Sequence, residues 1–174
     1  MLHGRFHSST ESLTTLMPFR VLFVCTANSA RSQMAEALLT TLGGGRFAAA
    51  SAGAVPAGRV SRRAVAALAE LGIDWSGHTP RGLNGLERQP WDLVITVCDA
   101  AKQACPIFTG SAAVVHWDLP DPMDANGTEE EMRQAFLRAR DVIAGLVERL
   151  IALPVEALSQ RDLVARVTEI GPRH

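Results

Sequence analysis

Short apolar runs without polar alternation constrain the fold of this chain most. Residues 20–25 read RVLFVC, residues 92–98 read DLVITVC and residues 112–117 read AAVVHW, each rich in β-branched side chains. Strands of this kind are buried on both faces, which is typical of a parallel sheet. Residues 47–52 form a fourth candidate strand. Because parallel strands need crossover connections, we expect helices between them.

Apolar residues recur at helical spacing between these runs. The first helix is predicted to follow the loop after residue 25 and to end at the glycines 43–45. A second helix is predicted over 60–71, with Ser61 as a candidate cap and Gly72 as its stop. Strands that alternate with helices predict an α/β fold, a single-domain three-layer sandwich with a four-stranded parallel sheet and helices on both faces.

A long amphipathic helix is predicted after the last strand. Thr128 opens it, Glu131 completes a capping box, and Pro154 ends it. The expected organisation is therefore a flexible leader over 1–17, a core domain over 18–153, and a C-terminal helical extension over 154–174. The length of 174 residues fits one such domain.

Composition and charge exclude several classes of protein. The chain is 47% apolar with 17 basic and 18 acidic residues, so neither nucleic acid nor a membrane surface is expected as its partner. No apolar run approaches the ~20 residues of a membrane-spanning helix. The three cysteines cannot all pair within one chain, which favours working thiols in a reducing cytoplasm. We expect a cytoplasmic protein with a small ligand.

The strongest chemical signal joins the first strand to the first helix. Cys25 closes the strand and Arg31 opens the helix, in the sequence CTANSAR. A loop of this length can curl so that its N–H groups point inward beside the positive helix end, forming a cup for a tetrahedral oxyanion. Arg31 would offer two parallel donors to such an anion. The expected substrate-binding residues are Thr26, Ala27, Asn28, Ser29, Ala30, Arg31 and Ser32.

The same environment favours Cys25 as a nucleophile. A helix N-terminus and a cationic neighbour both stabilise a thiolate, and Ser32 can add a hydrogen bond to it. The alternative is that Cys25 is a small buried apolar residue and Arg31 an ordinary surface residue. The position of the motif between a buried strand and a helix favours the nucleophile.

A carboxyl group completes the candidate site. Asp121 precedes Pro122 in the loop after the last strand, and a carboxyl near an anion can act as general acid. Asp118 and Asp124 lie close by, and all three can instead serve as turn residues. Asp121 is the preferred candidate because of the Asp-Pro pair.

At these motifs the chain resembles the low-molecular-weight protein tyrosine phosphatases and the arsenate reductases built on the same fold. The segment VLFVCTANSARSQMAEALL resembles their opening segment, and the likeness continues through SAG at 51–53, DLVITVC and HWDLPDP at 116–122. It covers about residues 19–151. The resemblance places the catalytic aspartate of the family at Asp121.

The arsenate-reductase branch resembles this chain more closely than the phosphatases do. Phosphatases of this fold commonly carry a second cysteine in the loop and a tyrosine after the Asp-Pro pair, where this chain has Ala30 and Met123. The reductases carry a cysteine pair after the third strand, which Cys98 and Cys105 match. The resemblance thus implies that Cys25, Arg31, Cys98, Cys105 and Asp121 are catalytic.

The implied activity is reduction of arsenate to arsenite for arsenic detoxification. By resemblance, Cys98 attacks an arseno-cysteine at Cys25, and Cys105 then takes over Cys98 on a segment that rearranges. The resulting disulfide implies an external thiol reductant, thioredoxin or glutathione with glutaredoxin, and no bound cofactor. In the alternative, Cys98 and Cys105 are incidental thiols.

Two other functions stay open from the sequence. A phosphatase acting on phosphotyrosine or small phosphoesters through a phosphocysteine would need only Cys25, Arg31 and Asp121. A non-catalytic anion sensor would need an inert Cys25.

A metal is not predicted. Some arsenate reductases hold potassium through residues matching Asn28, Glu36 and Ser51, but the next expected ligand, an aspartate, corresponds to Asn84 here. No spacing of histidine and cysteine matches a zinc site.

Overall fold

The computed structural model describes residues 16–110 and 112–173. All but the last two residues of the predicted leader, 1–17, lie outside this part of the chain. None of the helices described is both long and apolar enough to cross a membrane.

Four parallel strands form one sheet, as predicted. They are β1 (Phe19–Cys25), β2 (Phe47–Gly53), β3 (Leu93–Thr96) and β4 (Ala113–His116). Their order is β2-β1-β3-β4, so the first strand lies in the interior of the sheet beside β3. The register brings Cys25 level with Gly53 and places the carboxyl ends of all four strands at one edge. This edge carries the candidate site.

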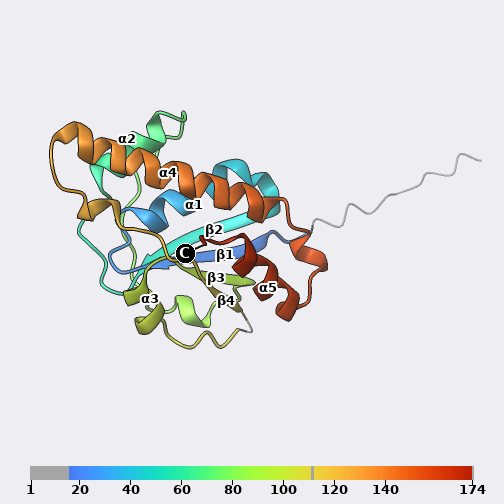
Figure 1. The fold of residues 1–174 in the computed structure, drawn as a ribbon. Coiled ribbons are helices and arrows are strands. Elements are labelled where there is room, and N and C mark those ends of the chain that lie inside the picture. Colours follow the sequence, from blue (N-terminus) through green and yellow to red (C-terminus); the bar gives the residue numbers. More distant parts are fainter. Residues whose placement is uncertain (1–15, 111, 174) are drawn as a thin grey trace, which may run out of the picture.

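In the part of the chain that the structure describes, five α-helices surround the sheet, and the predicted three-layer α/β sandwich is confirmed. They are α1 (Arg31–Leu42), α2 (Arg62–Ala69), α3 (Asp99–Ala104), α4 (Glu129–Ile151) and α5 (Gln160–Ile170). Figure 1 shows α1, α2 and α4 over one face, with α3 and α5 toward the other. The capping box at the start of α4 is present as predicted. Ser61 occupies the N-cap position of α2, but its side chain makes no capping bond.

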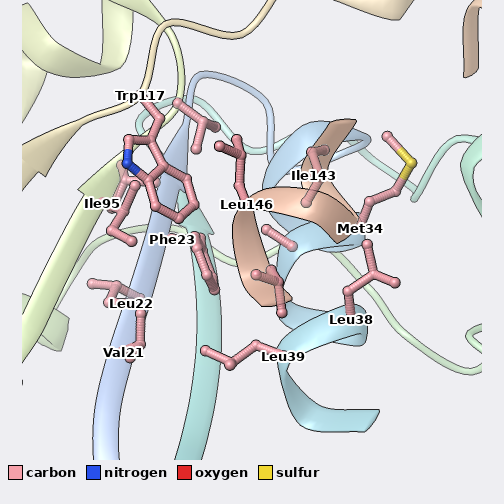
Figure 2. Packing of buried hydrophobic residues seen from close by; sticks show 14 of the residues in the cluster. Val21, Leu22, Phe23, Met34, Leu38, Leu39, Ile95, Trp117, Ile143 and Leu146 are labelled. Atoms are coloured by element: carbon pink, nitrogen blue, oxygen red, sulfur yellow. The ribbon is translucent and has the colours of Figure 1, made fainter. Parts of the chain in front are cut away.

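The core lies between β1 and the helices α1 and α4. Phe23 on the strand, Leu38 on α1 and Ile143 on α4 are almost completely buried and belong to one core cluster. Figure 2 shows Trp117 beside Phe23, with Leu38 and Ile143 farther toward the helices. Trp117 directly follows β4 and is fully buried. The apolar runs of the sequence thus form the core because both faces of the sheet are covered.

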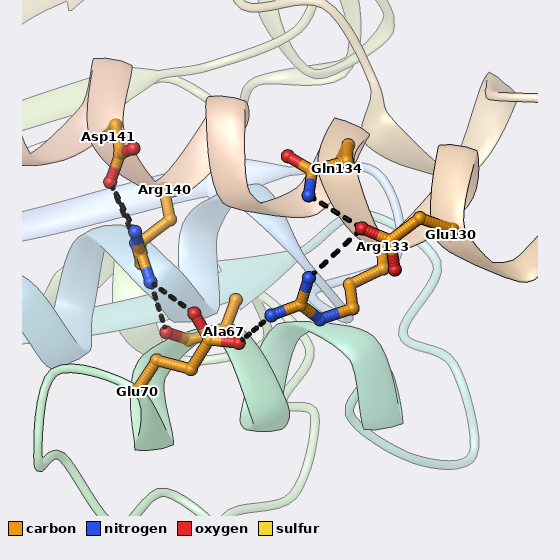
Figure 3. Close-up of polar contacts among 7 residues, drawn as sticks. All are labelled: Ala67, Glu70, Glu130, Arg133, Gln134, Arg140 and Asp141. Carbon is orange, nitrogen blue, oxygen red and sulfur yellow. Dashed lines mark hydrogen bonds and ion pairs between the residues drawn. The ribbon is translucent and has the colours of Figure 1, made fainter.

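Polar contacts fix α2 on α4. The buried Arg140 of α4 donates to the carbonyl of Ala67 on α2 at 2.9 Å and lies 3.6 Å from the carboxylate of Glu70. Glu70 also pairs with Arg133, which in turn pairs with Glu130 (Figure 3). The network fixes the C-terminal end of α2 on α4.

The chain after Pro154 forms a 3-10 turn (Val155–Ala157) and then α5. Trp117 Nε1 donates to the carbonyl of Val167 at 3.0 Å, so α5 covers the buried indole. Arg46 pairs with Glu156 at the start of the segment. The domain boundary at residue 154 stays a prediction.

Candidate active site

The loop from Cys25 to Arg31, here called the anion loop, is held in place by hydrogen bonds that its carbonyl groups accept from residues 54–61. Four amides of residues 54–61 donate to these carbonyls over 2.8–3.2 Å. The donor and acceptor pairs are Ala54 to Cys25, Val55 to Thr26, Ala57 to Ala27, and Ser61 to Ser29. Because the carbonyls point toward 54–61, the N–H groups of the loop are left for the concave side, where an oxyanion would bind.

Cys25 lies at the floor of this loop. Its side chain is buried, and Sγ accepts a hydrogen bond from the backbone N–H of Asn28 at 3.1 Å. The Ser32 hydroxyl lies 2.8 Å from the same sulfur. Two hydrogen bonds and the N-terminus of α1 therefore converge on this sulfur, an arrangement that suits negative charge.

Asn28 fixes the shape of the anion loop. Its φ of 51° lies in the left-handed region, which costs a non-glycine residue conformational energy. The buried side-chain amide of Asn28 offsets this cost, because its nitrogen donates two hydrogen bonds and its oxygen accepts two, all at 2.8–2.9 Å. It donates to Ser32 and Ser51 and accepts from the Gln33 side chain and the Arg81 backbone.

Gly53 allows the anion loop to approach the end of β2. A Cβ at this position would lie 2.6 Å from the Thr26 carbonyl oxygen and 2.8 Å from the Asn28 nitrogen. These contacts are with backbone, which cannot move aside without moving the loop. Only glycine fits here.

We therefore expect Gly53→Ala to weaken phosphate binding and turnover by at least tenfold, because the added methyl displaces the loop amides. Inhibition by inorganic phosphate and cleavage of a chromogenic phosphoester measure the change. Gly58→Ala is the matched control, since a Cβ there meets nothing within 4 Å. Equal phosphate inhibition of the two variants would contradict the role given to Gly53.

Arg31 joins the anion loop to the loop after β4. One guanidinium nitrogen donates to the Leu119 carbonyl at 2.8 Å and the other to Asp121 Oδ2 at 2.8 Å. Arg31 is largely buried and Asp121 is about one-third exposed. The two residues that the sequence assigns to anion binding and acid catalysis are thus brought together as an ion pair. An oxyanion that binds Arg31 must share this guanidinium with Asp121.

Cys98 also reaches the anion loop. Its buried Sγ lies 3.3 Å from the hydroxyl of Thr26, the residue next to Cys25. β3 ends at Thr96, before the predicted end, and Cys98 caps α3 by accepting a hydrogen bond from Ala101 N at 3.3 Å. The structure therefore brings this second thiol to the residue that follows the candidate nucleophile.

Cys105 stands at the other end of α3. It is half-buried, and this burial raises the pKa of its thiol above the ordinary value. Cys98 and Cys105 are seven residues apart and flank the helix at its two caps. Such a spacing corresponds to about 10 Å along an α-helix, whereas the Cα atoms of a disulfide lie about 4.4–6.8 Å apart. The two sulfurs can bond only if α3 unwinds.

The two histidines that the structure describes, His78 and His116, lie outside the anion loop. His78 stacks on Trp75 with ring centroids 3.4 Å apart, and His116 Nδ1 lies 2.8 Å from the Thr96 hydroxyl. Among the described residues, His116, Asp99 and Asp118 bring three ligand atoms within 4.8 Å of one another. Asp99 is exposed and lies 3.2 Å from His116 Nε2.

The residues that resemble a potassium site do not fit a cation here. Ser51 Oγ donates to Glu36 Oε2, and Arg81 donates to Glu36 Oε1 at 3.1 Å. The Asn28 carbonyl oxygen already accepts two hydrogen bonds. Burial is the largest influence on Glu36 and raises its pKa, while the hydrogen bond from Ser51 and the charge of Arg81 act against it. Sequence reasoning missed Arg81, whose guanidinium pairs with Glu36.

Known proteins match this chain over most of its length. The family model for the low molecular weight phosphotyrosine protein phosphatases matches residues 20–162. The arsenate reductase of Halalkalibacterium halodurans is 41% identical over 123 residues, 71% of this chain and 88% of that protein. The glutaredoxin arsenate reductase of Synechocystis sp. is 35% identical over 133 residues, 76% of this chain and 96% of that protein.

Solved structures of arsenate reductases also match this chain. An arsenate reductase in the phosphate binding state has a TM-score of 0.66 and 34% identity, covering 77% of this chain and 97% of its own. An arsenate reductase in the oxidized state has a TM-score of 0.64 and 34% identity, covering 76% and 96%. Fold, motif order and sequence agree over most of the chain. The chain belongs to the low molecular weight phosphotyrosine protein phosphatase family.

Proposed function

We propose that this protein reduces arsenate to arsenite. The observation that carries the proposal is the position of Cys98, whose thiol lies against Thr26 at the edge of the anion loop. Hydrolysis of a phosphoester has no need for a second thiol there, whereas reduction of arsenate needs two electrons. Relatives named arsenate reductase, at 34–41% identity, support this activity.

The first step is addition of arsenate to Cys25. The amides of the anion loop and Arg31 bind the oxyanion, and the Cys25 thiolate forms a bond to arsenic. One oxygen leaves as water, and Asp121 is the candidate donor of its proton. Because Asp121 pairs with Arg31, an anion that competes for the guanidinium would also release this carboxyl for proton transfer.

The second step transfers the electrons. The Cys98 thiolate attacks Cys25 Sγ, so that a sulfur–sulfur bond forms and the sulfur–arsenic bond breaks. The electron pair of the broken bond stays on arsenic, which leaves as arsenite. Arsenic gains two electrons and each sulfur loses one.

The third step moves the disulfide away from the anion loop. Cys105 attacks Cys98, which frees the Cys25 thiolate and leaves a bond between Cys98 and Cys105. The length of α3 supports an order of events in which the helix must first unwind. Unwinding also exposes Cys105, whose burial otherwise raises its thiol pKa and keeps it protonated.

An external thiol must then reduce the disulfide of Cys98 and Cys105. A dithiol protein of the thioredoxin type or glutathione with glutaredoxin can supply the two electrons, and no bound cofactor is needed. A relative named glutaredoxin arsenate reductase supports a thiol reductant of this kind. A cytoplasmic location is part of the proposal, because the cytoplasm keeps thiols reduced.

The test is arsenite production by the purified chain with each reductant supplied separately. Thioredoxin with its reductase is the first arm, and glutathione with glutaredoxin is the second. We expect sustained turnover in one arm and none for Cys25→Ser in either. Absence of arsenite from the wild-type chain in both arms would overturn the proposal.

Phosphatase activity is the second candidate function. The anion loop, Arg31 and Asp121 together provide a nucleophile, anion donors and a carboxyl group, which suffice for phosphoester hydrolysis through a phosphocysteine. Cleavage of a phosphotyrosine peptide without arsenate reduction would favour it.

A further inference from the structure

Glu36 is a buried carboxylate behind the anion loop that the proposed chemistry does not use. It belongs to α1, and only 9% of its side chain is exposed. A buried charge is costly unless a partner of opposite charge and hydrogen bonds compensate it. Arg81 is the ion-pair partner, with 3.1 Å between its guanidinium nitrogen and Glu36 Oε1.

The backbone of Arg81 is fixed independently of its side chain. Its N–H donates to the Asn28 side chain at 2.8 Å, and its carbonyl accepts from the N–H of Gly53 at 2.8 Å. Gly82, the next residue, forms a parallel bridge to Gly53. Any residue at position 81 keeps these backbone bonds, so a substitution tests the guanidinium alone.

A continuous series of hydrogen bonds leads from this ion pair to the nucleophile. Glu36 accepts from the hydroxyl of Ser51, and Ser51 Oγ accepts from Asn28 Nδ2 at 2.9 Å. Asn28 also donates to Ser32 Oγ at 2.8 Å, and Ser32 lies 2.8 Å from Cys25 Sγ. Because the acceptor oxygen of Glu36 sets the direction of the Ser51 hydroxyl, it orients the groups that follow.

We propose that Arg81 is a positioning residue, whose guanidinium compensates the buried carboxylate of Glu36 and thereby keeps Asn28 and Ser32 directed at Cys25. In this chain the guanidinium takes the place of a bound monovalent cation beside the anion loop. The inference depends on the proposed function only in that Cys25 is the nucleophile. It applies equally to arsenate and to a phosphoester.

The experiment compares Arg81→Ala, Arg81→Lys and the double variant Arg81→Ala with Glu36→Gln. Cleavage of a chromogenic phosphoester is the main readout, since it does not require Cys98 or Cys105. We expect Arg81→Ala to lower kcat by about 10- to 100-fold, because small displacements of a reacting group have effects of this size. Arg81→Lys should retain most of the activity. Arg161→Ala is the control, since this exposed arginine lies on α5.

Two further measurements separate charge from mere structure. The Arg81 side chain is 51% exposed, so added guanidinium ion can enter its place, and we expect it to restore turnover of Arg81→Ala. The double variant should be more active than Arg81→Ala, because the unpaired buried carboxylate is gone. Potassium should stimulate Arg81→Ala and raise its thermal midpoint while leaving the wild-type chain unchanged.

Each outcome of these measurements supports or contradicts the positioning role of Arg81. Unchanged kcat in Arg81→Ala, or an impaired variant that neither guanidinium, potassium nor the second substitution improves, would overturn the positioning role. Failure of arsenate reduction with phosphoester cleavage intact would instead count against the proposed function. The same set of proteins therefore distinguishes the two.

Discussion

Cys98→Ser is expected to release no arsenite, whereas Cys105→Ser is expected to release about one equivalent per chain and then stop. Without Cys98, no neighbouring thiol attacks Cys25 Sγ, so the arseno-cysteine cannot form a disulfide and release arsenite. Without Cys105, the bond between Cys25 and Cys98 forms once and stays in the anion loop. Arsenite measured after mixing excess arsenate with the reduced protein distinguishes these stoichiometries.

Phosphoester cleavage supplies the control for this pair of variants. Neither cysteine touches the reacting phosphorus in the proposed chemistry, so both variants should keep most of their phosphatase activity. A matched loss of both activities would mean that the substitution damages the anion loop. Sustained arsenite production by both variants with thioredoxin would exclude the relay.

The helix between Cys98 and Cys105, α3, is the element that is hardest to predict from the sequence. Six residues, Asp99–Ala104, are too few to show a periodic apolar pattern. The small residues Ala100, Ala101 and Ala104 suggest a segment free to rearrange, yet alanine is also the strongest helix former. In the structure this propensity and the cap by Cys98 decide the outcome. Unwinding such a short helix costs little, which suits a segment that must rearrange.

The sheet, by contrast, could be predicted because a local sequence pattern marks each of its strands. The continuous apolar runs mark strands buried on both faces, and their helical connections make the sheet parallel. The ends differ: β3 and β4 stop at Thr96 and His116, where ladder pairing ends rather than where the apolar run ends. Backbone pairing depends on the neighbouring strand, which one segment alone does not reveal.

The candidate site follows the same division between local and distant contacts. Cys25, Asn28 and Ser32 lie within one loop and helix turn, so their spacing already predicts that they share a cup. The Arg31–Asp121 pair joins residues 90 positions apart, and the Arg81–Glu36 pair joins residues 45 apart. Such pairings depend on where the fold places two loops, and no local pattern marks them.

Arg31→Lys is expected to lower kcat/KM for both arsenate and a phosphoester by about 10²- to 10³-fold, the usual cost of losing one oxyanion donor. The guanidinium spans from the Leu119 carbonyl to Asp121 with separate nitrogens, each at 2.8 Å. A lysine ammonium is a single point of donation and cannot hold both groups and an anion. Inhibition by inorganic phosphate should weaken in parallel.

Arg138→Lys is the matched control, because this exposed arginine lines the same cavity of about 310 Å³ as Arg31 and Asp121. It should leave both activities and phosphate inhibition unchanged, since the substitution keeps the charge at the cavity wall. If Arg31→Lys instead lost only arsenate reduction, its effect would lie in the cysteine relay rather than in anion binding. Loss of both activities together, with Cys98→Ser losing only one, therefore assigns Arg31 to the oxyanion and Cys98 to the electrons.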